Sequence, residues 1–140
     1  MVDSSRYVDI NIFVYWLGNH PQFGNTACEW IKKIENSRHG EYVTSSLTLY
    51  ETLVIVAGLS GKSLKDSAFV EEVVYAITHI KGLVIEPLEL EDLTKATNLM
   101  KEYHIDYEDS IHLAVATRTG VREIVSNDKD FDATPIKRTI

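Results

Sequence analysis

The sequence contains a single cysteine, Cys28, among its 140 residues. An intrachain disulfide or a cysteine metal cluster is therefore excluded, and the chain suits a reducing compartment. No apolar run approaches the ~18 residues needed to cross a bilayer. The start of the chain, MVDSSRYVDI, lacks the basic and apolar parts of a signal peptide. We therefore expect a soluble, cytoplasmic protein with no membrane partner.

Positive charge is also scarce. Lys and Arg number 14 against 21 Asp and Glu, which gives a formal charge of −7. Such a surface argues against sequence-indifferent adhesion to nucleic acid, so any contact with nucleic acid has to be local. Repeats, low-complexity tracts and proline-rich linkers are missing as well, and a chain of this length can form one hydrophobic core. We expect a single domain over residues 1–140.

Short β-branched runs alternate with longer segments of helical periodicity. The predicted strands cover residues 6–10, 41–45, 82–88, 123–126 and 136–140. The predicted helices cover residues 11–18, 22–38, 45–61, 62–79, 91–104 and 106–120, and the third of these is expected to be largely buried. Parallel strands need crossover connections, so this order predicts the α/β class, with three α/β/α layers around a central, mainly parallel sheet. In such sheets ligands bind at the carboxyl ends of the strands.

Three carboxylates occur in the run SNDKDFD, directly after the fourth predicted strand. Asp128, Asp130 and Asp132 alternate as in a calcium loop, but Ala133 stands where such a loop needs glycine and Thr139 where it needs glutamate. A calcium loop is therefore excluded. Asp128 remains a candidate ligand, whereas Asp130 and Asp132 fit a solvated turn, with Asp130 close enough to support the site.

Three further carboxylates are predicted near the same edge of the sheet. Asp9 ends the first strand, Glu51 lies in the apolar segment LTLYETLVIVA, and Asp109 falls in the first turn of a helix that Asp106 caps. Each also has a structural explanation: Asp9 and Asp109 suit helix starts, and Glu51 could pair with a distant Lys or Arg. Two carboxylates ~4 Å apart repel by about 4 kcal/mol at a dielectric of 20, so converging ones hold protons or cations. Oxygen ligands favour Mg²⁺ or Mn²⁺, and such a site suits phosphoryl transfer.

The segments VDINIFVYWL, TSSLTLYETL, YEDSIHLAVAT and IVSNDKDFD resemble the acidic motifs of PIN-domain ribonucleases, especially the VapC-type toxins of toxin–antitoxin pairs. The resemblance implies a PIN-like fold and a cytoplasmic endoribonuclease dependent on Mg²⁺ or Mn²⁺, commonly dimeric and inhibited by a small antitoxin. It implies catalytic metal ligands at Asp9, Glu51, Asp109 and Asp128, supported by Asn11 and Ser126. The chain departs from the family at Ile10, where Thr or Ser is usual, and some members use the acid that corresponds to Asp130.

Two other functions fit the same acids. A Mg²⁺-dependent phosphatase would need a second acid after the nucleophile of the first strand, and VDINI has none. A catalytically silent binding module would use the acidic site formed by these carboxylates to bind a basic peptide. His112, one turn after Asp109, fits either a hydrogen bond to a ligand carboxylate or a satisfied position in the core.

Large aromatic and basic side chains suggest contacts beyond the acids. The aromatic residues of the early helices are abundant for so short a chain, and we expect some of them in a homodimer interface: Phe13, Trp16, Phe23 and Trp30. The basic residues near the acidic run could guide an RNA backbone or form an ordinary solvated surface: Arg118, Arg122, Lys129, Lys137 and Arg138.

Overall fold

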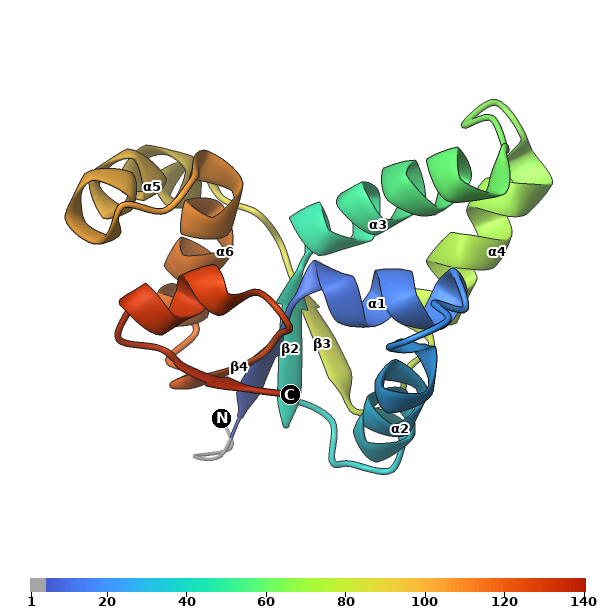
Figure 1. Ribbon diagram of the computed structural model, residues 1–140, viewed down its shortest axis with the longest axis horizontal. Helices are drawn as coiled ribbons and strands as arrows, with labels where there is room; N and C mark the ends of the chain where they lie inside the picture. The colour runs from blue at the N-terminus through green and yellow to red at the C-terminus, as the bar shows by residue number, and fades with distance from the viewer. Residues whose placement is uncertain (1–4) are drawn as a thin grey trace.

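The computed structural model describes residues 5–140, so the first four residues of the segment MVDSSRYVDI lie outside the described part. Its core is a five-stranded sheet in the order β3-β2-β1-β4-β5, and every pair of neighbouring strands is parallel (Figure 1). The strands are β1 (Arg6–Val8), β2 (Tyr42–Ser45), β3 (Leu83–Glu86), β4 (Glu123–Val125) and β5 (Lys137–Thr139). All five predicted strands are present, and the predicted α/β class is confirmed.

Helices cover both faces of this sheet. They are α1 (Ile10–Leu17), α2 (Gly24–Glu35), α3 (Ser46–Ser60), α4 (Ser67–Thr78), α5 (Leu90–Tyr103) and α6 (Tyr107–Arg118), followed by a short 3₁₀ helix η1 (Lys129–Ala133). Figure 1 shows α1 to α4 on one side of the sheet and α5 and α6 on the other. Successive strand residues face opposite ways, so Val8 joins the core under α1 to α4 while Tyr7 joins the core under α6. The predicted three layers are therefore confirmed.

Two details of the predicted helices were wrong. Helix α4 begins at Ser67 rather than at residue 62, because the Asp66 side chain caps the helix by accepting a hydrogen bond from the Phe69 amide. Helix α3 is not largely buried, since Val54 and Leu59 are 40% and 68% exposed. It packs mainly on α1 and α4 and extends away from the sheet with α4 (Figure 1). Within residues 5–140, no helix combines the length and apolarity needed to cross a membrane.

The strand order changes direction at β1, which has β2 on one side and β4 on the other. The register pairs Val8 with Val125, so the residues that follow, Asp9 and Ser126, leave the sheet at the same level. The Asp9 amide continues this pairing with a hydrogen bond of 3.0 Å to the Val125 carbonyl. A change in strand order at the carboxyl ends of parallel strands is where α/β sheets bind ligands, and the first candidate acid lies there.

Candidate metal centre

Asp9 is held at the end of β1 by hydrogen bonds to both of its carboxylate oxygens. One oxygen caps α1 by accepting from the Ile10 amide at 2.8 Å, and the other accepts from the Ser126 hydroxyl at 2.5 Å. The Asn11 amide group donates to the same Asp9 oxygen and to the Ser126 hydroxyl, each at 3.3 Å. Asp9 is only 3% exposed, and this burial raises the pKa of its carboxyl group. The structure thus orients Asp9 rigidly through Asn11 and Ser126.

Asp109 and Asp128 converge from helix α6 and from the loop after β4. The Asp109 amide donates to the side chain of Asp106, which caps α6 as predicted. The Asp128 side chain caps η1 by accepting a hydrogen bond from the Asp130 amide. The Asp128 amide donates a hydrogen bond of 3.0 Å to the Ser126 hydroxyl. Asp109, Asp128 and Asp130 each offer an oxygen atom within 4.8 Å of the others. Three carboxylates this close favour a shared proton or cation.

The electrostatics of Asp109 reflect this crowding. Burial, followed by the charges of Asp128, Asp106, Asp9 and Asp130, raises the pKa of Asp109 to about 8. Without a cation, the folded protein therefore keeps a proton on Asp109 near neutral pH. A divalent cation would stabilise the ionised carboxylates and take the place of that proton.

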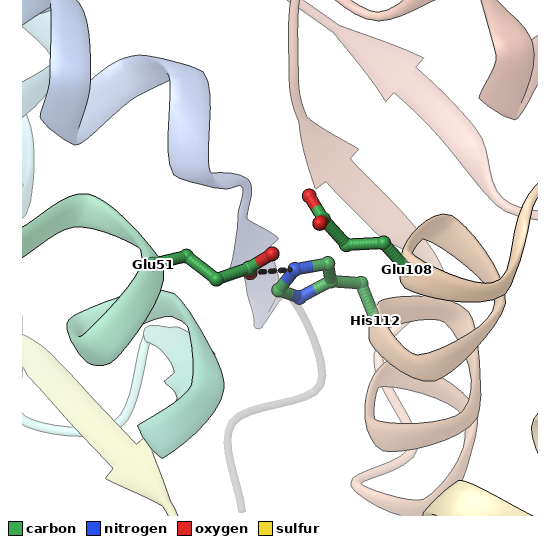
Figure 2. A group of neighbouring side chains, drawn as sticks. All are labelled: Glu51, Glu108 and His112. Atoms are coloured by element: carbon green, nitrogen blue, oxygen red, sulfur yellow. Dashed lines mark hydrogen bonds and ion pairs between the residues drawn. The ribbon is translucent and has the colours of Figure 1, made fainter. Parts of the chain in front are cut away.

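The structure groups Glu51 with Glu108 and His112 and does not bring it into the Asp109–Asp128–Asp130 group. The Oε1 atom of Glu51 is 2.8 Å from Nε2 of His112, and the Glu51 side chain is 12% exposed (Figure 2). Its partner is thus a histidine rather than a distant Lys or Arg, and His112 is both a buried core residue and a hydrogen-bond partner of a candidate ligand. The charge of His112 also lowers the pKa of Asp9, so His112 is close enough to act on Asp9 as well as on Glu51.

Two residues near the site were missed by the sequence analysis. The Tyr7 hydroxyl contacts Nδ1 of His112 at 2.6 Å, in a fully buried position. Glu108 approaches Glu51 from the exposed start of α6, and the neighbouring Glu51 carboxyl group, together with burial, raises the pKa of Glu108 to about 7. The spacing of Glu108 and His112, four residues apart on a predicted helix, is the signal that could have revealed this second group.

Two of the predicted basic contacts are already used within the protein. Arg118 donates two hydrogen bonds to the buried carboxylate of Asp92, each 3.0 Å long. Arg138 pairs with Asp132 at 2.9 Å, and this pairing lowers the pKa of Asp132. Asp132 therefore has a cationic partner of its own and is not part of the Asp109–Asp128–Asp130 group. Lys129, beside that group, is exposed and remains a candidate for an RNA contact.

The sequence of residues 6–137 matches the profile of the PIN domain. The chain belongs to the PIN domain family. The resemblance seen in the sequence motifs is thus confirmed over nearly the whole chain. A comparison with curated protein sequences gives no match.

This PIN domain is also similar in fold to solved toxin structures. VapC20 of Mycobacterium tuberculosis, a toxin that cleaves the sarcin–ricin loop, is 17% identical, with a TM-score of 0.73 over 92% of this chain and 94% of that one. A toxin–antitoxin complex from Klebsiella pneumoniae is 20% identical, with a TM-score of 0.67 over 97% of both chains. VapBC2 from Rickettsia felis, bound to a DNA fragment of its promoter, is also 20% identical, with a TM-score of 0.63 over 96% of both. At these identities the likeness shows the fold.

Proposed function

We propose that this PIN domain is a metal-dependent endoribonuclease that hydrolyses RNA phosphodiester bonds, and that it is the toxin of a toxin–antitoxin pair. The observation that carries the proposal is the convergence of Asp109, Asp128 and Asp130 beside the buried, oriented Asp9. A toxin of the same fold cleaves the sarcin–ricin loop, and two other structures of this fold contain toxin–antitoxin pairs, which supports both parts of the proposal.

The ion we propose is Mg²⁺ or Mn²⁺, with Asp9, Glu51, Asp109 and Asp128 as ligands of one ion or two, and Asp130 as a further donor. The donor set fits such ions, because the aspartates offer only oxygen atoms, and burial together with neighbouring negative charge raises the pKa of Asp109. When bound, the ion supplies a nucleophilic water at neutral pH and positive charge for the phosphate.

The chain's own residues have separate tasks in this reaction. Ser126 and Asn11 hold the Asp9 carboxylate in one orientation, which keeps a ligand in place before any ion arrives. Asp109 gives up its proton as the cation is bound, so its raised pKa couples metal binding to pH. None of these side chains forms a covalent bond to the substrate.

The phosphatase alternative fits the site less well. A phosphatase of this kind needs an aspartate free to attack phosphorus, whereas Asp9 is 3% exposed and hydrogen-bonded through both oxygens. The position of the second acid is occupied by Asn11, which donates to Asp9. The catalytically silent binding module remains an outcome that the following experiment distinguishes.

Purified protein should cleave single-stranded RNA with Mg²⁺ or Mn²⁺ and not with EDTA. Asp109→Asn should abolish cleavage while circular dichroism shows an intact fold, because the substitution removes a central ligand. Asp132→Asn is the matched control: it lies in the same acidic run but pairs with Arg138, so cleavage should persist. If several RNAs remain uncleaved with both metals, the protein is a binding module. Its carboxylate site should then bind a basic peptide.

Assembly is the second part of the proposal. We propose a homodimer and a small antitoxin partner, but two of the aromatic residues predicted at the interface are not available for it. Phe13 is fully buried and Trp30 is 7% exposed, because both pack into the core under α1 to α4. Exposed apolar side chains lie instead on α3 and α4, as at Leu59 and Tyr75, which are 68% and 63% exposed. This surface is the better candidate for the dimer interface.

A further inference from the structure

Glu51, Glu108 and His112 form a group of possible metal ligands with a chemistry different from that of the aspartates. Each offers one ligand atom, and the three atoms lie within 4.8 Å of one another. Glu108 and His112 share one face of α6, and Glu51 faces them from α3 (Figure 2). In Figure 2 both carboxylates point into the space between the two helices, beside the imidazole ring.

The orientation of His112 matches that of a histidine prepared to bind a metal. Its ring is 1% exposed, and the Tyr7 hydroxyl contacts Nδ1 at 2.6 Å. Tyr7 is itself fully buried in β1, so this contact fixes the ring and directs Nε2 toward Glu51 and Glu108. Metal-binding histidines are usually held in this way, with one ring nitrogen bonded to a protein group and the other on the metal.

The group also carries more negative than positive charge. Two carboxylates share one imidazole, and within residues 5–140 neither Glu51 nor Glu108 forms an ion pair with Lys or Arg. The ligand atoms of Glu51 and Glu108 lie within 4.8 Å of each other, so the two carboxylates repel when both are ionised. A cation that contacted both carboxylates would relieve this repulsion.

We propose that Glu51, Glu108 and His112 form a second cation site that prefers a transition metal such as Zn²⁺ or Mn²⁺ to Mg²⁺. The preference follows from the nitrogen ligand, because imidazole suits transition metals whereas Mg²⁺ takes oxygen. Glu108 is exposed, so an ion can enter from solvent while His112 stays buried. The site deepens the proposed function and rests on it for a role in catalysis, since Glu51 belongs to the proposed catalytic ligands, but metal binding itself needs no RNA.

The ion would replace the direct contact between Glu51 and His112. That contact is the 2.8 Å hydrogen bond of the metal-free protein. A bound ion would bond to both partners in its place, and the Nε2 proton would pass to solvent. Dependence on Glu108 distinguishes a metal site from a simple ion pair, because an ion pair between Glu51 and His112 needs no third group. A variant at Glu108 therefore tests the site without removing the buried pair.

Zn²⁺ binding to the metal-free full chain is measured by calorimetry, together with histidine ¹⁵N NMR, in the absence of RNA. Zn²⁺ should bond to Nε2 of His112, assigned with His112→Gln, and move its resonance to that of a metal-bound nitrogen. Saturating Mg²⁺ takes oxygen ligands such as Glu51 and should not give a metal-bound Nε2 signal. Glu108→Gln should weaken Zn²⁺ binding at this site about tenfold or more and change Mg²⁺ affinity less than twofold. Asp109→Asn is the matched variant, and it should retain the His112 shift with Zn²⁺.

The experiment distinguishes failure of the second metal site from failure of the ribonuclease proposal. An unmoved His112 resonance in the wild-type chain at saturating Zn²⁺ overturns the site, and so does unchanged Zn²⁺ binding in Glu108→Gln. Either result leaves the ribonuclease proposal standing, since that depends on RNA cleavage with Mg²⁺ and its loss in Asp109→Asn. Conversely, a shifted His112 resonance in a protein that cleaves no RNA supports the second site and overturns only the ribonuclease. If His112→Gln does not fold, titration of the wild type with Zn²⁺ and Mg²⁺ still shows whether any buried imidazole binds metal.

Discussion

Glu51 on α3 and His112 on α6 are joined by a hydrogen bond of 2.8 Å between Oε1 and Nε2. The contact bridges helices from the two opposite faces of the sheet, at the edge where β1 ends. Burial alone would lower the pKa of His112, but its contacts with Tyr7 and Glu51 raise it well above the ordinary value. The metal-free protein therefore holds an ion pair here, which determines the sign of the effect of substitutions at Glu51.

Glu51→Gln should destabilise the metal-free protein. The substitution leaves the buried, charged His112 without its carboxylate, and breaking a buried pair from one side typically costs about 3 kcal/mol. Urea unfolding in EDTA at pH 6 measures the effect. The matched variant is Glu108→Gln, which removes the second carboxylate but not the pair, so its free energy of unfolding should hold or rise. A rise in stability for Glu51→Gln would mean that repulsion among the acids, and not the pair with His112, dominates at this position.

The fold could be predicted from local patterns because each strand and helix carries its own signal. Five β-branched runs separated by helical segments require crossovers, and that is enough for a parallel sheet. The exposure of α3 could not be predicted, because the helix is apolar on all sides and only the placement of α1 and α4 decides which side chains face solvent. The start of α4 was missed because the capping contact of Asp66 outweighs the helical pattern before it.

The site could be predicted only in part for a related reason. Asp9 and Asp128 follow neighbouring strands, so the topology alone brings them to one edge. The direction of the Glu51 side chain could not be predicted in this way, because Glu51 can reach either the aspartates or His112 from the same backbone position. That choice depends on His112, whose orientation is fixed by Tyr7 on strand β1. A contact between residues 105 positions apart leaves no local pattern in a single sequence.

Gly82 should not tolerate a side chain. It precedes β3, where a Cβ atom would lie 1.8 Å from the Ser37 hydroxyl and 2.2 Å from the Ile34 carbonyl. Because the carbonyl belongs to the backbone and cannot move away freely, Gly82→Ala should lower the free energy of unfolding by about 2 kcal/mol or more. Gly58→Ala is the control: nothing lies within 4 Å in the helix α3, so this variant should gain about 0.5 to 1 kcal/mol. Denaturant unfolding measures both, and equal stabilities would contradict the close packing at Gly82.

The protein should be a dimer at micromolar concentration. Leu59 is 68% exposed on α3, and Leu59→Lys should shift the protein to monomer because a charge there would be buried in the proposed interface. Leu90, 77% exposed at the start of α5, is the control because α5 covers the other face of the sheet, so Leu90→Lys should leave the dimer intact. Light scattering measures the mass. A wild-type protein that is monomeric at this concentration would contradict the prediction.

The stability of the metal-free protein should fall as the pH rises from about 5 to 8. Burial and neighbouring acids raise the pKa of Asp109 to about 8, whereas an aspartate in the unfolded chain titrates near ~3.9. Between these values the folded protein holds a proton that the unfolded chain has lost, so each rise in pH favours unfolding, by at most about 1.4 kcal/mol per unit for one such proton. The pKa of Glu108 is raised to about 7, so Glu108 also makes the folded protein less stable as the pH rises. The pKa of His112 is raised above the ~6.5 of an unfolded histidine, and His112 therefore acts in the same direction.

Asp109→Asn isolates the contribution of this one carboxyl group. Its stability in EDTA should fall less steeply than that of the wild type between pH 5 and 8, because the proton held by Asp109 is absent. Asp132→Asn should keep the wild-type slope, since the pairing with Arg138 lowers the pKa of Asp132 and places its titration below this range. Saturating Mn²⁺ should reverse the trend, because an ion that needs the ionised aspartates binds more tightly as the pH rises, and tighter binding to the folded state adds stability. Urea unfolding at pH 5, 6, 7 and 8, with EDTA and with Mn²⁺, measures all three proteins. Identical slopes for the wild type and Asp109→Asn would contradict the raised pKa of Asp109 and the proton that the folded protein is expected to hold there.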